Sequence, residues 1–228
     1  MSAEFRKNSM LKLWKTIPWA VLLTTLLLLG GCARDQAGFI RGTSRFHTVV
    51  VDAGHGGFDL GARAISGSRE KTLNLDTSRR LASELSARGF RVKETRTKDV
   101  FVPLSNRSQV ANHSRGSVFV SIHYNWSRRA GARGIEIFYN SPQSRRLAAN
   151  VLQEVVRVYR TDNRGIKRAD FYVLRTNKRP AILCELGFLS NPQDNQHAQS
   201  PHYRQRLAEA IAEGILAERR GRIPSRAD

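Results

Sequence analysis

The chain has 228 residues, of which 38 are Lys or Arg and 19 are Asp or Glu, so its formal net charge is +19. A hydrophobic content of 40% is ordinary for a globular protein and excludes a disordered chain. No apolar run is long enough for a polytopic membrane protein, and the 2 cysteines exclude a disulfide scaffold.

The first 31 residues have the pattern of an export signal. Basic residues at positions 6, 7, 12 and 15 precede the apolar stretch Ile17 to Leu29, and Gly30 and Gly31 follow it. Leu29-Gly30-Gly31-Cys32 resembles the lipobox of bacterial lipoproteins, in which the cysteine becomes the acylated N-terminus. We therefore predict a signal peptide over residues 1–31, lipidation of Cys32, and a location on the periplasmic side of a bacterial membrane. The alternative is an uncleaved N-terminal anchor, for which the stretch is short.

The excess of basic residues suits polyanions and anionic membrane head groups. Nucleic acid is the first partner that such a charge suggests. Export argues against it, and the basic residues are scattered without an RNA-binding or helix-turn-helix signature. We therefore predict no nucleic-acid partner, and contact with a membrane through the N-terminal lipid.

Residues 32–45 mix small and charged residues without periodicity and are expected to form a linker. Beyond them, β-branched and apolar runs predict strands, and apolar residues at helical spacing predict helices. The expected strands are 48–51, 90–93, 117–123, 134–139, 171–174 and 181–185, and the expected helices are 70–88, 104–113, 144–160 and 203–216. The charged segment from Thr161 to Ala169 is expected to be a loop.

This alternation of strands and helices predicts an α/β fold, a single domain with a largely parallel twisted sheet flanked by helices. The domain is expected over residues 46–218, with a basic polar tail over 219–228. Cys184 lies in an apolar run and is expected to be a buried strand thiol. In such sheets functional groups gather at the carboxyl ends of the strands.

Three residues of the kind that binds metals or protons end apolar strands: His55, His123 and Glu185. Glu70 opens the first expected helix. Two imidazoles and one carboxylate are a ligand set of catalytic zinc, and a second carboxylate would act as the base. Each residue also has a plainer interpretation, such as a loop or capping histidine, a satisfied core imidazole, or a carboxylate at a helix N-terminus.

Four segments carry a family resemblance. They are Val50-Val51-Asp52-Ala53-Gly54-His55-Gly56-Gly57, Glu70 with Leu73 and Asn74, Ser121-Ile122-His123-Tyr124-Asn125, and the run from Pro180 to Asn191. In order and spacing they resemble the zinc-dependent N-acetylmuramoyl-L-alanine amidases of the amidase-3 type. The middle segment, with Thr95-Arg96, Asp99, Leu104 and Asn106-Arg107, also fits. The resemblance extends from about Thr48 to Ile215.

The resemblance implies that His55, Glu70 and His123 bind Zn²⁺ and that Glu185 is the catalytic carboxylate. It also implies the substrate, peptidoglycan, cleaved at the amide between N-acetylmuramic acid and the L-alanine of the stem peptide. Zinc-bound water would attack this amide, with the glutamate as general base.

Some family members carry a helical insertion between the second histidine and the catalytic glutamate that blocks the site until an activator removes it. Here the expected strands and helix fill the interval between His123 and Glu185, so we predict no plug and no obligatory activator. The segment from Thr161 to Ala169 is the part of the interval that would overturn this.

Polar and aromatic residues close to His123 are candidates for substrate binding. Asn125, Arg128 and Arg129 are expected to meet the substrate, as is Arg133, with the arginines facing carboxylates of stem peptides. A solvated basic loop is the alternative. Tyr124 and Trp126 either face sugar or peptide, or pack at the rim.

Two other functions stay open at this point. A zinc peptidase, such as a carboxypeptidase acting on stem peptides, would use the same four residues. A catalytically silent wall-binding protein would not need all of them. Reaction products separate these alternatives, because an amidase frees intact stem peptides and a peptidase shortens them.

Overall fold

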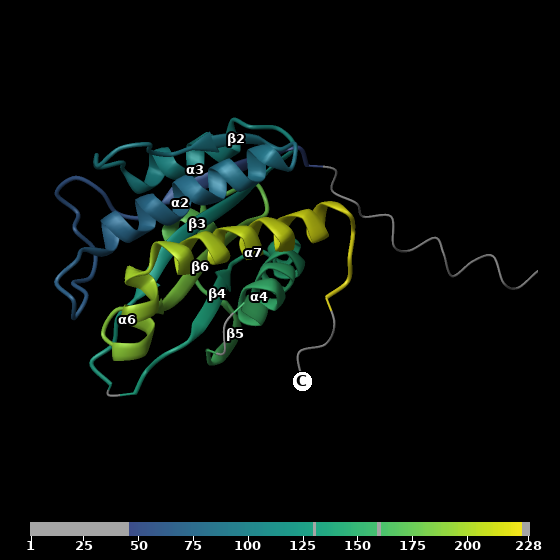
Figure 1. The fold of residues 1–228 in the computed structure, drawn as a ribbon. Helices are drawn as coiled ribbons and strands as arrows, with labels where there is room; N and C mark the ends of the chain where they lie inside the picture. The colour runs from purple at the N-terminus through teal and green to yellow at the C-terminus, as the bar shows by residue number, and fades with distance from the viewer. Residues whose placement is uncertain (1–45, 130, 159–160, 225–228) are drawn as a thin grey trace, which may run out of the picture. The chain divides into compact units, whose positions relative to one another are not determined.

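The computed structural model describes residues 46–129, 131–158 and 161–224. The expected signal peptide, Cys32 and the linker lie outside these residues. Figure 1 shows a sheet with helices on both faces. The sheet has six strands in the order β2-β1-β3-β6-β4-β5.

The strands are β1 (Thr48–Ala53), β2 (Arg91–Glu94), β3 (Ser117–Asn125), β4 (Ile135–Tyr139), β5 (Asn163–Arg168) and β6 (Ala181–Phe188). All neighbouring pairs are parallel except β4 and β6, which are antiparallel. The helices are α2 (Glu70–Ala87), α3 (Leu104–Asn112), α4 (Arg145–Val158), α5 (Tyr172–Arg175), α6 (Pro192–Gln199) and α7 (Pro201–Arg219), with a 3-10 turn η1 (Pro142–Ser144). The predicted α/β fold with a largely parallel sheet is therefore confirmed.

The two faces of the sheet carry cores of different size. Helices α2, α4 and α7 pack together on one face, over a large core that includes Val49, Val51 and Ile122. Helices α3 and α5 cover part of the other face, where a smaller core contains Val50 and Phe119. Alternate residues of β1 thus point to opposite cores, which explains why Val49, Val50 and Val51 are apolar without a break.

Three local predictions need correction or completion. The expected strand 171–174 is wrong, because this segment forms the short helix α5, which buries Val173 and Leu174 in the smaller core. A short apolar run has no period that separates a strand from a helical turn. The expected loop 161–169 is also wrong, because it contains the edge strand β5. The helix α6 was not expected, although Asn191 caps it and Pro192 occupies its first turn.

No helix among residues 46–224, leaving aside positions 130, 159 and 160, has the length and apolar character to cross a membrane.

Candidate metal centre and catalytic carboxylate

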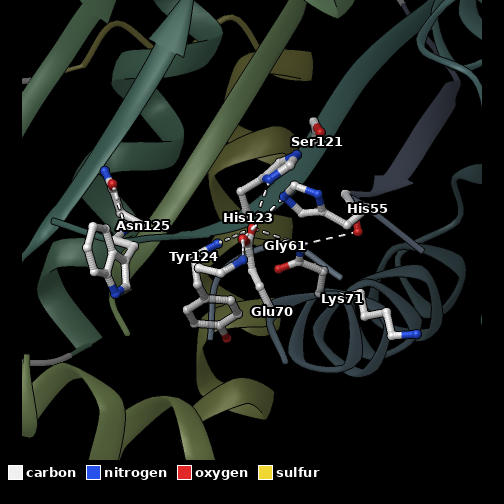
Figure 2. A network of polar contacts seen from close by, with 12 residues as sticks. His55, Gly61, Glu70, Lys71, Ser121, His123, Tyr124 and Asn125 are labelled. Carbon is white, nitrogen blue, oxygen red and sulfur yellow. Dashed lines mark hydrogen bonds and ion pairs between the residues drawn. The ribbon is translucent and has the colours of Figure 1, made fainter. Parts of the chain in front are cut away.

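The carboxyl end of the sheet brings the three expected metal ligands together. His55 follows β1, Glu70 is the first residue of α2, and His123 lies near the end of β3. Glu70 lies between the two rings, as Figure 2 shows, with Oε2 3.2 Å from His55 Nε2 and Oε1 2.9 Å from His123 Nδ1. The donor atoms of the three residues all lie within 4.8 Å of one another.

Hydrogen bonds from neighbouring residues fix the orientation of these side chains. Asp59 Oδ1 lies 2.8 Å from His55 Nδ1, so the other nitrogen of this ring faces Glu70. Glu70 in turn accepts hydrogen bonds from the backbone N–H of Ala62 and from Asn74 Nδ2, at 2.9 and 3.1 Å. Such outer partners are what orient ligands in metal sites.

Two glycines leave the space in which the ligands meet. A Cβ on Gly54 would lie 2.2 Å from His123 Cε1 and Nε2, so a side chain there would displace the ring. Gly61 has a φ of +63°, and a Cβ on it would lie 2.7 Å from Glu70 Oε2 and 2.8 Å from His55 Cδ2. The glycines after β1 therefore serve close packing around the ligands.

Two buried arginines hold the loop that carries His55. Arg96 donates from Nε to the carbonyl of Ala53 and from Nη2 to that of Gly54, at 2.9 and 2.8 Å. Arg107 donates to the carbonyls of Ala53 and His55 at 2.7 and 2.8 Å. These bonds satisfy carbonyl groups that the buried loop would otherwise leave without partners.

The charges of the cluster support one another. Burial alone would raise the pKa of Glu70, but hydrogen bonds from His123 and His55 hold it well below its ordinary value. Burial alone would lower the pKa of His55, but Glu70 and Asp59 outweigh burial and raise it. The site therefore holds an ionised carboxylate between two imidazoles, an arrangement that attracts a cation.

Glu185 stands beside this cluster on the neighbouring strand. It is the register partner of His123 in the parallel pair of β3 and β6. Its Oε2 is buried and has no hydrogen-bond partner among the described residues. Burial, with the negative charges of Glu70 and Glu136, raises the pKa of Glu185 well above its ordinary value. An unpaired buried carboxyl is costly for the fold and typical of groups that exchange protons in a reaction.

A cleft gives access to these residues. It has a volume of about 440 Å³ and contains His55, His123 and Glu185 in its lining. Much of the remaining lining is apolar. It comes from Leu183 on β6 and from the segments around α3 and α5, with Phe101, Val102, Leu104, Phe171, Tyr172 and Val173. The cleft therefore combines reactive groups with a mostly apolar wall, as ligand sites commonly do.

The donor set fits Zn²⁺. Two imidazole nitrogens and one carboxylate are suited to this ion, and three protein ligands leave a further position for water or substrate. His55 and Glu70 already have hydrogen bonds to residues outside the ligand set, of the kind that orients metal ligands.

The family comparison agrees with this geometry. A model of the Amidase_3 family, described as N-acetylmuramoyl-L-alanine amidase, matches residues 49–217. The chain belongs to this amidase family.

Related amidases share the fold and much of the sequence. AmiC2 of Nostoc punctiforme is 38% identical, with a TM-score of 0.72 over 74% of this chain and 94% of the solved chain. An amidase from Clostridium difficile 630 is 37% identical, with a TM-score of 0.73 over 76% of this chain and 96% of that one. The probable cell wall amidase LytH of Staphylococcus aureus is 35% identical over 74% of this chain, which spans 57% of LytH.

Outside the metal cluster, the expected substrate residues fall into different environments. Asn125 donates from Nδ2 to Glu136 Oε1 at 2.8 Å, and in Figure 2 its side chain points away from the His–Glu cluster. Arg128 and Arg129 are exposed. Arg133 forms an ion pair with Asp162 at 3.0 Å. The binding roles of these residues stay predictions.

The two aromatic residues after His123 differ from each other. Tyr124 is buried, and its hydroxyl forms a 2.9 Å hydrogen bond with Thr77, so the prediction that it faces substrate or the rim is wrong. Trp126 is exposed. Cys184 is a free, buried thiol as expected, and burial raises its pKa.

The residues that support the ligands had no role assigned from the sequence, although Asn74 is part of a segment that carries the family resemblance. Asp59 and Asn74 orient His55 and Glu70, yet each looks like an ordinary polar residue of a loop or helix. Their spacing is the available signal, since Asp59 follows His55 by four residues and Asn74 follows Glu70 by four residues.

Proposed function

We propose that this protein is a zinc-dependent amidase that cleaves the bond between N-acetylmuramic acid and L-alanine in peptidoglycan. The observation that carries the proposal is the unpaired, buried carboxyl of Glu185 beside the His55–Glu70–His123 cluster. Membership of the amidase family supports the choice of bond.

Each residue has a distinct part in this reaction. His55, Glu70 and His123 would hold Zn²⁺, with Asp59 and Asn74 fixing two of them. When bound, Zn²⁺ supplies an acidified water and polarises the scissile carbonyl.

Glu185 accepts the proton of the attacking water at its free Oε2 and later returns it to the leaving amine of L-alanine. The raised pKa of Glu185 suits both transfers, since a group that must give the proton back needs affinity for it. The apolar side chains of the cleft, with Phe101 and Leu104 among them, reduce the access of bulk water to the reaction.

We further propose that the protein is exported and held at a bacterial membrane through lipid on Cys32. The basis is the sequence of residues 1–32, with its basic start, apolar stretch and lipobox-like end. Peptidoglycan on the periplasmic side is then the substrate within reach.

An obligatory activator is not part of the proposal. Between His123 and Glu185 the described residues form β4, η1, α4, β5 and α5, and the segment 161–169 contains a strand of the sheet. The CwlD amidase of Clostridioides difficile, 31% identical to this chain, was solved in complex with the GerS lipoprotein, so a partner protein is the alternative to test.

The test is digestion of purified peptidoglycan by the full chain in detergent. We expect free stem peptides beginning at L-alanine, detected by mass spectrometry, and expect the products to disappear with a chelator and to return with Zn²⁺. Glu185→Gln should bind zinc like the wild type and lose about a thousandfold in rate.

The products decide between the candidate functions. Shortened stems would replace the amidase by a peptidase. Zinc binding without any product would indicate a missing activator or a wall-binding protein, and addition of cell envelope extract would separate the two.

A further inference from the structure

The part of the sheet next to Glu185 carries charged residues on the face that α3 and α5 partly cover. These helices pack against β1, β3 and β6. Beyond β6 the sheet continues with β4 and β5, whose residues Glu136 and Lys167 belong to a polar cluster. Glu136 is the register partner of Glu185 in the antiparallel pair, so the cluster begins one strand away from the catalytic carboxyl.

Glu136 gathers three donors from two other strands. Its side chain is buried, and Oε1 accepts a 2.8 Å hydrogen bond from Asn125 Nδ2. Oε2 accepts a 3.0 Å bond from Arg164 Nε and a further bond from Lys167 Nζ. One buried carboxylate therefore faces two cations, and the cluster keeps a net positive charge.

The two cations, unlike the carboxylate, are open to solvent. The exposed fraction of the side chain is 34% for Arg164 and 43% for Lys167, against 6% for Glu136. The guanidinium of Arg164 also lies 4.9 Å from the ring centre of Phe188, which restricts its position. Glu136 and Phe188 thus hold two partly exposed cations in place, which lowers the entropy cost of binding an anion.

The cleft itself has a mostly apolar side. Phe101, Leu104, Phe171 and Tyr172 form much of it. The lining also includes Arg107, but its Nε, Nη1 and Nη2 already donate to Val102, Asp52, Ala53 and His55. The side of the cleft at α3 and α5 is therefore mostly apolar, whereas the cluster of Glu136, Arg164 and Lys167 lies on β4 and β5, beyond the strand of Glu185.

We propose that Arg164 and Lys167 bind the α-carboxylate of the second residue of the stem peptide, so that the stem extends from Glu185 across β4 toward β5. This inference rests on the proposed function. The glycan is neutral, and the stem carries carboxylates that lie outside its peptide chain. Because the stem is the acidic part of the substrate, the two cations on β5 select its direction.

The spacing of the strands agrees with this placement. Neighbouring strands lie about 4.8 Å apart, and both cations reach the carboxylate of Glu136 on β4, one strand from Glu185. An extended peptide advances about 3.3 Å per residue. The α-carboxylate of the second residue then lies about two residues from the scissile nitrogen. At that distance it can meet the head groups of Arg164 and Lys167, which lie at Glu136 on β4.

The test measures binding of the reaction product by titration calorimetry, with the full zinc-loaded chain in detergent. Two tripeptides that begin with L-alanine are compared, identical except that the α-carboxyl of the second residue is a free acid or a primary amide. We expect the wild type to bind the acid at least about tenfold more tightly, as hydrogen bonds to charged groups are stronger. Lys167→Gln and Arg164→Gln should each reduce this ratio below about threefold and leave binding of the amide unchanged.

Matched variants keep the result interpretable. Arg168 is a cation on the same strand, and its Nε donates to the carbonyl of Asn140. Arg168→Gln should leave the ratio of acid to amide affinity at the wild-type value. Lys167→Arg should restore the preference for the acid. Equal binding of acid and amide by the wild type, or a preference that survives in both glutamine variants, would overturn the inference.

The same peptides attached to N-acetylmuramic acid distinguish this inference from the proposed function. Cleavage without a preference for the acid would refute the role of Arg164 and Lys167 alone. A preference for the acid in the product, with no cleavage of the muramyl peptide, would refute the amidase alone.

Discussion

The two halves of the sheet differ in what covers them and in what they contribute to the cleft. The half formed by β2, β1 and β3 is parallel, and β1 is buried along its whole length. It supplies His55 and His123, and α2 adds Glu70. The half formed by β4 and β5 ends in an edge strand and supplies Glu136, Arg164 and Lys167. Buried packing thus surrounds the metal ligands, and a charged cluster occupies the half along which we propose that the stem peptide extends.

The sharpest way to break this comparison is to disturb the packing under the ligands. Gly54→Ala places a Cβ 2.2 Å from the ring of His123, so the ring must move. We expect hydrolysis to fall about 100-fold or more, since a displacement of about 1 Å has such an effect on a reaction site. Zinc affinity, measured by competition with a chelator, should fall as well.

A second glycine serves as the control for this substitution. A Cβ on Gly67 would have no neighbour within 4 Å, although its φ of +92° makes alanine strained. Gly67→Ala should lower the free energy of unfolding by about 1 kcal/mol and leave zinc affinity unchanged. Wild-type zinc affinity in Gly54→Ala would contradict this prediction, because it would show that the ring of His123 can move without loss of metal binding.

Loss of the partner of His55 should have a smaller effect. Asp59→Ala removes the carboxylate 2.8 Å from His55 Nδ1, so the ring loses its fixed orientation. We expect zinc affinity to fall about 10- to 100-fold, measured with a fluorescent chelator. Asp162→Ala, in the other half of the molecule, breaks the ion pair with Arg133 and should leave zinc affinity as it is. Equal losses in the two variants would contradict a special role for Asp59.

The charged half should respond to pH through Glu136. Burial raises the pKa of this carboxyl, but hydrogen bonds from Lys167 and Arg164 outweigh burial and hold the pKa below its ordinary value of 4.5. The ionised form therefore stabilises the fold above about pH 4.5, and this contribution disappears as the pH falls through the lowered pKa.

Glu136→Gln measures that contribution. We expect the variant to be less stable than the wild type by about 1–2 kcal/mol at pH 7, because the glutamine has no charge to pair with Arg164 and Lys167. The loss stays small because these partly exposed partners regain water. Urea unfolding at a series of pH values should show the difference shrinking below pH 4.5. A difference that is constant from neutral to acidic pH would mean that the charge of Glu136 contributes nothing to stability.

The smallest effect is expected at the exposed arginines after β3. Arg128→Gln and Arg129→Gln together should change the free energy of unfolding by less than about 0.5 kcal/mol. If these residues contact stem peptides only at the rim of the cleft, KM should rise less than about threefold with kcat unchanged. A larger rise in KM would show that the loop after β3 also takes part in binding the stem peptide.

The same difference between the halves decided what the sequence could predict. His55, His123 and Glu185 follow or end apolar runs, so both their place in the sheet and their chemistry were readable. The strand β5 is Asn163–Arg168, a polar segment at the sheet edge, where one face meets solvent and no apolar run is needed. A segment of this kind has the sequence of a loop.

The support of the ligands was hidden for a different reason. Asp59 and Asn74 act through hydrogen bonds to single atoms, and such bonds leave no periodic pattern in the sequence. The helix α5 was mistaken for a strand because two adjacent buried residues, Val173 and Leu174, fit either structure. Predictability here followed apolar burial, and it ended where single polar contacts or the edge of the sheet began.

The strand order also determines when the molecule becomes complete during synthesis. The last strand in the chain, β6, lies between β3 and β4, so it joins two parts that have no strand pairing with each other before it arrives. His55, Glu70 and His123 all precede it by more than fifty residues, whereas Glu185 belongs to it. A growing chain therefore has the residues of its candidate metal site long before its proposed proton acceptor. Pairing over such sequence distances forms late in folding, so hydrolytic activity waits for the whole domain.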